Sequence, residues 1–331
     1  MKSCLFAISL LCFLHGMAQK NTGYGLNHTF HITSDGWWDY LSVYGNELYV
    51  SHGTQVNILN KTTGDSLGVI GNTTGVHGIT FDPASGKGFT SNGRTNDVTV
   101  FLLKTKDTLG RIPAGENPDA ILFDGFSGKL VTCNGRSNDL TVIDPVTRQK
   151  VATIPVGGKP ETLVSDGNGK WFVNIEDKNE IALVDARTYS VQAHWSLGQA
   201  ESPTGLAYDP ITHQLFAGCE KKLVVMDALT GKVNATLPIG DGCDGVAFDE
   251  QSRLIFTSNG EGTMTILKVE KNGKTKIVDT IPTKKGARTL AIDPETHLIY
   301  LPTADFEPMA SGEKGRPKMK SGSFQILVYG N

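Results

Sequence analysis

Charged and polar side chains recur along this chain at a nearly regular interval. Successive members lie 38 to 44 residues apart. They are Asp39, His77, Asp119, Glu161, Thr204, Asp244 and Arg288. Six of the seven are ionisable, and turn formation favours Asp without requiring His, Glu or Arg at matching positions. We therefore expect these seven residues to form one ring that binds a ligand. The structural alternative is a solvated rim that only caps strand ends.

A second set of side chains falls about 13 to 17 residues after the first, in the loops that follow the second strand of each repeat. The candidate ligand-binding residues among them are His52, Arg94, Arg136, Glu176 and Glu220. Arg94 and Arg136 each follow Asn-Gly in neighbouring repeats, so we expect them to lie side by side. Two adjacent guanidinium groups could grip a carboxylate or a phosphate. The Asn-Gly pairs themselves are interpreted as hairpin turns.

The two sets divide by charge around the predicted ring. The basic members are Arg288, His52, His77, Arg94 and Arg136, in repeats 7, 1, 2 and 3. The acidic members in repeats 4 to 6 are Glu161, Glu176, Glu220, Asp244 and Glu261. This polarity predicts an anionic or zwitterionic small ligand, or a protein segment. No cofactor is predicted; Ca²⁺ or another divalent cation is the alternative, because carboxylates are suitable ligands for it.

Catalytic signatures are weak in this sequence. Asp39, His77, Glu161 and Asp244 are the candidates, since a His beside a carboxylate is suited to acid–base chemistry near neutral pH. No Gly-x-Ser-x-Gly elbow, phosphate-binding Gly loop or paired-cysteine motif is present. We expect a binding protein rather than an enzyme. A lactonase-type hydrolase, with or without a divalent metal, is the alternative.

A repeat of four short strands must position these residues. In residues 118–159, alternation and turn signals predict strands at 119–123, 129–134, 139–144 and 150–156. Copies begin near residues 38, 76, 118, 160, 203, 243 and 287. A meander of about 42 residues cannot bury both faces alone, so the copies must stack on one another.

The last copy ends after its third strand, and residues 28–33 (HTFHIT) precede the first copy with strand character. We expect this N-terminal segment to complete the last sheet, which would remove the exposed edges. The predicted fold is an all-β, seven-bladed β-propeller with four-stranded antiparallel blades. An open solenoid is the alternative.

The segment KLVTCNGRSNDLTVIDPVTRQKVATIPVGGKPE resembles the YVTN-type β-propeller repeat, and residues 232–240 match the same pattern. The resemblance covers nearly all of residues 37–331, although blades 1 and 4 match poorly. It implies a YncE-like extracytoplasmic propeller. It implies no activity, because this fold carries many functions.

Residues 1–18 have the features of a secretory signal peptide: Lys2, an apolar run over residues 5–14, and small residues before a cut after Ala18. We expect a single mature domain over residues 19–331 that is secreted or periplasmic, with no membrane span. A lipoprotein site at Cys12 is the weaker alternative. The formal charge of −3 argues against a nucleic-acid partner. We expect a monomer with a small molecule or a protein partner at the top face.

Two features are left open. Cys133, Cys219 and Cys243 remain after cleavage, and a Cys219–Cys243 disulfide competes with the interpretation of buried thiols. An insertion over residues 304–322 carries Lys314, Arg316, Lys318 and Lys320. Its composition predicts a mobile loop rather than extra strands, acting as a lid, a partner contact or a surface loop with no role.

Overall fold

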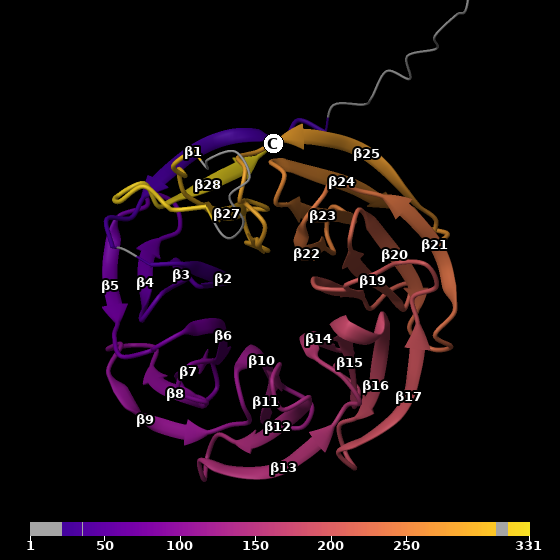
Figure 1. The fold of residues 1–331 in the computed structure, drawn as a ribbon, viewed down its shortest axis with the longest axis horizontal. Helices are drawn as coiled ribbons and strands as arrows, with labels where there is room; N and C mark the ends of the chain where they lie inside the picture. The colour runs from indigo at the N-terminus through magenta and orange to yellow at the C-terminus, as the bar shows by residue number, and fades with distance from the viewer. Residues whose placement is uncertain (1–21, 35, 309–316) are drawn as a thin grey trace, which may run out of the picture.

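The computed structural model describes residues 22–34, 36–308 and 317–331. Within these residues, seven four-stranded sheets account for all the named strands. Neighbouring strands pair antiparallel, and the sheets stand in a ring around a common axis (Figure 1). The predicted seven-bladed β-propeller is confirmed.

Each blade is built from the axis outward. Blade 1 contains β2 (Trp38–Tyr44), β3 (Glu47–His52), β4 (Gln55–Asn60) and β5 (Ser66–Ile70). Blade 2 contains β6 (Val76–Asp82), β7 (Lys87–Asn92), β8 (Asp97–Leu102) and β9 (Thr108–Pro113). Blade 3 contains β10 (Pro118–Asp124), β11 (Lys129–Asn134), β12 (Asp139–Asp144) and β13 (Gln149–Pro155). Blade 4 contains β14 (Pro160–Ser165), β15 (Lys170–Ile175), the short 3-10 helix η1 (Glu176–Lys178), β16 (Glu180–Asp185) and β17 (Ser190–Ser196).

The remaining blades follow the same order. Blade 5 contains β18 (Leu206–Asp209), β19 (Gln214–Cys219), β20 (Lys222–Asp227) and β21 (Val233–Pro238). Blade 6 contains β22 (Cys243–Asp249), β23 (Leu254–Asn259), β24 (Thr263–Val269) and β25 (Thr275–Pro282). Blade 7 contains β26 (Ala291–Ile292), β27 (Ile299–Thr303), β28 (Gln325–Gly330) and β1 (Gly25–His31). In blade 3 the predicted strands agree to within one residue, whereas the innermost strand of blade 7 is much shorter than expected.

The N-terminal strand closes the ring. β1 pairs antiparallel with β28, so the last blade takes its outer strand from the start of the chain. The strand lies at Gly25–His31 rather than at the predicted residues 28–33. Past the strand, the Ile32 amide still donates to the Phe324 carbonyl at 3.0 Å before the chain turns inward to β2. Closure is therefore confirmed, with a shifted boundary.

The apolar core lies between neighbouring blades. One buried cluster joins Tyr49 and Ile58 of blade 1 to Ile79 and Phe101 of blade 2. The third strands are buried on both faces, as β8, β12 and β20 show. A sheet covered on both faces by other sheets needs apolar residues on both faces, which explains the absence of alternation in these strands.

Buried aspartates at the turns after the innermost strands link one blade to the next. Asp124 accepts a hydrogen bond from Ser165 in the following blade at 2.7 Å. Arg253 donates from blade 6 to Asp209 of blade 5, with Nη1 at 2.6 Å from Oδ1. Across the closure, Lys61 Nζ of blade 1 lies 2.9 Å from Asp293 Oδ2 of blade 7. The turn aspartates therefore hold the ring together as well as shaping turns.

Several sequence predictions concern the ends and the insertion. The predicted signal peptide lies outside the described residues. No helix in the described ranges is long and apolar enough to cross a membrane. Cys133, Cys219 and Cys243 are buried free thiols. The described base of the insertion contains no named strand, in agreement with the prediction of a loop rather than extra strands, and it has one isolated antiparallel bridge between Phe306 and Met319. Residues 309–316 lie outside the described ranges.

Candidate functional site

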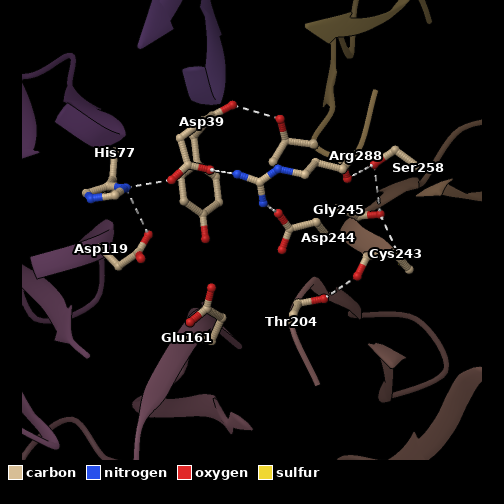
Figure 2. A network of polar contacts seen from close by, with 12 residues as sticks. Asp39, His77, Asp119, Glu161, Thr204, Cys243, Asp244, Gly245, Ser258 and Arg288 are labelled. Carbon is tan, nitrogen blue, oxygen red and sulfur yellow. Dashed lines mark hydrogen bonds and ion pairs between the residues drawn. The ribbon is translucent and has the colours of Figure 1, made fainter. Parts of the chain in front are cut away.

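The axial cluster is a group of ionisable side chains near the axis of the ring, on the innermost strands or, for Arg288, in the segment before β26 (Figure 2). Its members are Asp39, His77, Asp119, Glu161, Asp244 and Arg288. The first five occupy the second position of β2, β6, β10, β14 and β22. In each of these strands the register with the second strand shifts at or just after that position. Such bulges redirect side chains, which explains how equivalent residues of different blades meet.

His77 lies between two carboxylates. Its Nδ1 is 2.6 Å from Asp39 Oδ2 and 3.7 Å from Asp119 Oδ1. All three side chains are mostly buried, with 27%, 15% and 13% of their surface exposed for His77, Asp39 and Asp119. Asp119 Oδ1 is buried and has no hydrogen-bond partner among the described residues. The cluster therefore contains a carboxylate oxygen that can still accept a donor or a cation.

Burial and mutual charge shift the proton affinities of this group. Burial disfavours the charged imidazolium, but the Asp39 hydrogen bond and the neighbouring carboxylates outweigh it and raise the pKa of His77 to about 9. Burial, with the charges of Asp39 and Glu161, raises the pKa of Asp119 to about 8 despite the opposing His77. At neutral pH His77 is therefore positive and Asp119 holds its proton.

Glu161 belongs to a neighbouring ion-pair group. Lys159 Nζ lies 3.1 Å from Glu161 Oε2 and also contacts Glu176. Burial and the nearby Glu176 and Asp39 raise the pKa of Glu161, although Lys159 opposes the shift. Sequence reasoning missed Lys159. Its position two residues before Glu161, in a turn that leads into β14, was the available signal.

Arg288 connects the acidic residues on the other side of the cluster. It forms an ion pair with Asp244, and its Nη2 lies 3.9 Å from Asp39 Oδ1 (Figure 2). Around the axis, His77 thus lies between Asp39 and Asp119, and Arg288 lies between Asp244 and Asp39. The predicted separation into a basic half and an acidic half is wrong for this part of the ring, because each cation is held by a carboxylate of another blade.

Hydroxyl groups fix the backbone beneath the cluster. Ser91 of blade 2 donates to the Asp119 carbonyl, and Ser258 of blade 6 donates to the Arg288 carbonyl at 2.5 Å. Thr289 donates to the Asp39 carbonyl at 2.7 Å. Thr204, which was aligned with the ionisable positions, donates to the Cys243 carbonyl at 2.7 Å. Polar groups of one blade thus position the site residues of the next.

Two residues predicted to bind ligand lie away from the axial cluster. His52 is fully buried, stacks on Phe324 at a centroid distance of 4.0 Å, and contacts Ser34 and the Gly36 carbonyl through its ring nitrogens. Packing against blade 7 thus removes it from the face where a ligand could reach it. Glu220 is exposed on the rim beside Asp241, which raises its pKa by hydrogen bonding.

The two arginines predicted to lie together are both exposed, in the β7–β8 and β11–β12 turns. No ion pair or side-chain hydrogen bond of Arg94 or Arg136 occurs within the described ranges. The glycine before Arg94 has a role that the hairpin interpretation missed. An added Cβ on Gly93 would lie 2.7 Å from His77 Nε2, so a glycine leaves room for the imidazole.

In the β7–β8 and β11–β12 turns, the residue with a positive φ angle is not the glycine of the Asn-Gly pair. Asn96 and Asn138 have φ of 57° each, whereas Gly93 and Gly135 have no positive φ. Asn tolerates this conformation better than most residues. The Asn-Gly pairs therefore lie in hairpins as interpreted, but the residue with a positive φ comes three residues after the glycine.

Asp39, His77 and Asp119 could together hold a metal ion. One ligand atom of each lies within 4.8 Å of the others. Two carboxylates and an imidazole suit several divalent cations. The partly buried Tyr40 lies close by, with its hydroxyl 3.3 Å from Thr162 Oγ1, and burial next to Asp119 and Glu161 raises its pKa well above the usual value, so it stays a neutral phenol.

Comparisons with known proteins give the fold without a family. No family model matches the chain. No curated protein sequence matches it either. Among solved structures, a chain of hydrazine synthase from Kuenenia stuttgartiensis is similar, with a TM-score of 0.71 and 16% identity. The match covers 96% of this chain and 99% of the other. At this identity the similarity supports the seven-bladed propeller fold alone.

Proposed function

We propose that this protein is an extracytoplasmic β-propeller binding protein whose axial cluster holds the ammonium group of a small zwitterionic ligand. The observation that carries the proposal is Asp119 Oδ1, a buried carboxylate oxygen without a hydrogen-bond partner among the described residues. Without a bound cation Asp119 holds its proton at neutral pH, because its pKa is raised to about 8. A bound ammonium group would favour the ionised carboxylate, since a nearby opposite charge lowers the pKa of a carboxyl group.

The neighbouring residues favour a zwitterion over a purely anionic ligand. Asp39 and Glu161 are charged neighbours of Asp119 that raise its pKa, and their carboxylates would repel an anion at this position. The anionic end of the ligand would reach the exposed Arg94 and Arg136 in the turns of blades 2 and 3. In this arrangement the two arginines bind the anionic end of the ligand, as expected from the sequence, and the carboxylates bind its ammonium group.

The test compares three small molecules of similar length by calorimetry: 4-aminobutyrate, butyrate and butylamine. We expect 4-aminobutyrate to bind more tightly than either partial analogue. Asp119→Asn should weaken it at least tenfold, because the Asp119 carboxyl group can ionise when the ammonium group binds and an amide cannot. Glu220→Gln is the matched control, since Glu220 is exposed outside the cluster. Tighter binding of butyrate, or unchanged binding to Asp119→Asn, would contradict the proposal.

A second candidate function is a metal-dependent hydrolase of the lactonase type. The convergence of Asp39, His77 and Asp119 within 4.8 Å is the observation in its favour. These side chains would hold a divalent cation, which would polarise a carbonyl. Elemental analysis of the purified protein and hydrolysis of a simple lactone, each before and after chelation, test it. Metal-free protein that gains neither stability nor activity with Ca²⁺, Mn²⁺ or Zn²⁺ would exclude this candidate.

A further inference from the structure

We propose that a separate aromatic pocket at the seam between blades 6, 7 and 1 binds a planar aromatic carboxylate. The pocket has a volume of about 340 Å³. Its walls include Trp37, Trp38 and Phe306, and Lys285 and Arg288 also line it. Small-molecule sites usually start at roughly 300 Å³, so this volume suits a ligand of one or two rings.

The aromatic side chains already form a stack that a ligand ring can extend. Trp37 and Phe306 are stacked, with ring centroids 6.2 Å apart and an interplanar angle of 24°. Trp38 lies behind them, 5.8 Å from Trp37 and 5.1 Å from Phe324. Trp37 remains 42% exposed, so a large apolar ring stays in contact with water. A planar ring on this face would bury apolar surface and gain aromatic stacking.

Gly286 leaves space for the Phe306 ring, because it has no side chain. An added Cβ on Gly286 would lie 2.8 Å from the Phe306 ring, and Gly286 has φ of 86°. Phe306 is placed by the bridge between its segment and Met319, in the described base of the insertion. The insertion therefore supplies a wall of the pocket.

The polar chemistry of the pocket selects an anion. The polar side-chain atoms of its lining residues are all N–H donors, from two indoles, an ammonium and a guanidinium. Lys285 is exposed and its side chain has no ion pair among the described residues, whereas the adjacent Lys284 pairs with Asp305 at 2.5 Å. Arg288 is already held by Asp244 and Asp39. Lys285 is thus the cation available to a ligand carboxylate.

Calorimetry with phenylacetate tests this proposal, with phenethylamine, cyclohexylacetate and acetate as matched probes. We expect phenylacetate to bind more tightly than all three, because only it has both a planar ring and a negative charge. Trp37→Ala and Lys285→Ala should each weaken binding at least tenfold. Lys271→Ala, in the β24–β25 turn at the other end of blade 6, should leave it unchanged. Circular dichroism and melting temperature verify that each variant is folded.

Three outcomes would overturn the proposal: phenethylamine binding as tightly as phenylacetate, cyclohexylacetate binding as tightly as phenylacetate, or unchanged binding to folded Trp37→Ala and Lys285→Ala. The pocket shares Arg288 with the axial cluster, but Trp37 and Lys285, the residues proposed to bind the ligand, do not belong to that cluster. Asp119→Asn should therefore keep phenylacetate binding while losing 4-aminobutyrate, and Trp37→Ala should do the reverse. Loss of phenylacetate in Asp119→Asn would instead place the anion at the axial cluster and refute the separate pocket.

Discussion

At the scale of single residues, Asp119 is a buried carboxyl group whose surroundings oppose its ionisation. Burial opposes its ionisation most strongly, and the charges of Asp39 and Glu161 add to this effect, whereas His77 counteracts it. Its pKa of about 8 lies above that of an unfolded Asp, so the folded state disfavours the charge. The unfolded chain ionises above about pH 4, and stability is therefore lost as the pH rises from there toward 8.

This argument predicts that Asp119→Asn stabilises the protein while weakening ligand binding. At pH 8 the gain should be at least about 1 kcal/mol, because one pKa unit corresponds to about 1.4 kcal/mol. Urea unfolding at pH 8, with Glu220→Gln as the neutral control, measures the change. A destabilised Asp119→Asn would show that the ionised carboxylate is well accommodated in the native cluster.

His77 should contribute to stability with the opposite dependence on pH. Its folded pKa of about 9 lies above the unfolded value of 6.5, so the contribution is fully present below pH 6.5 and is lost as the pH rises through 9. We expect His77→Gln to cost about 2 kcal/mol at pH 6.5 and clearly less at pH 10. Urea unfolding of chelator-treated protein at both values provides the measurement.

The control for His77 is His194→Gln, which breaks a more exposed pair with Glu180 whose side chains are 36% and 25% accessible. Its cost should stay below about 1 kcal/mol. A cost of His77→Gln that is the same at pH 6.5 and pH 10 would mean that the imidazole is not held as a cation by Asp39.

At the scale of elements, β1 provides a strong test of closure because its two faces differ. Phe30 is 6% exposed and packs in the cluster shared by blades 7 and 1, whereas Leu26 on the same strand is 55% exposed. An added Cβ on Gly64 of blade 1 would touch the Phe30 ring, which shows how closely the strand packs.

Phe30→Ala should therefore lower the free energy of unfolding by about 3 kcal/mol through the lost apolar burial and the cavity left behind. Leu26→Ala should change it by less than about 0.5 kcal/mol. Chemical denaturation of both variants gives the comparison. Equal costs would indicate that β1 adds to the edge of blade 7 without contributing to the core.

At the scale of the whole molecule, the ring is joined at one seam by an ion pair. Lys61 and Asp293 have 5% and 1% of their side chains exposed, and the Tyr300 hydroxyl also donates to the Lys61 carbonyl at 2.9 Å. The hydrogen bonds from Thr296 and Lys61 lower the pKa of Asp293 even though burial opposes them. The pair thus holds blade 1 to blade 7 on the inner side, while β1 holds them on the outer side.

Lys61→Met should cost about 3 kcal/mol, because it leaves Asp293 buried without its cation. Lys276→Met removes the exposed pair with Glu270, whose side chains are 55% and 35% accessible, and should cost less than about 1 kcal/mol. Thermal and urea unfolding of both variants measure the difference. Equal costs would show that the seam pair does not stabilise the closed ring.

Most of the fold could be predicted because its signals are local. Turn residues and apolar runs within each repeat define the strands, and their number defines the blades. The positions of the axial residues followed from the same alignment, as Asp39, His77 and Asp119 show. The short innermost strand of blade 7 and the bridge at Phe306 were not predictable, because no repeat pattern covers them.

The sequence by itself determined that seven similar sheets must stack and that ionisable residues stand at equivalent places in them. Only the tertiary structure decided which of these residues meet. His52 and His77 both stand at strand ends, yet Phe324 of the last blade covers the former and Asp39 of the first blade binds the latter. Contacts between blades depend on ring closure and on bulges that redirect side chains, and neither leaves a periodic signal in the chain.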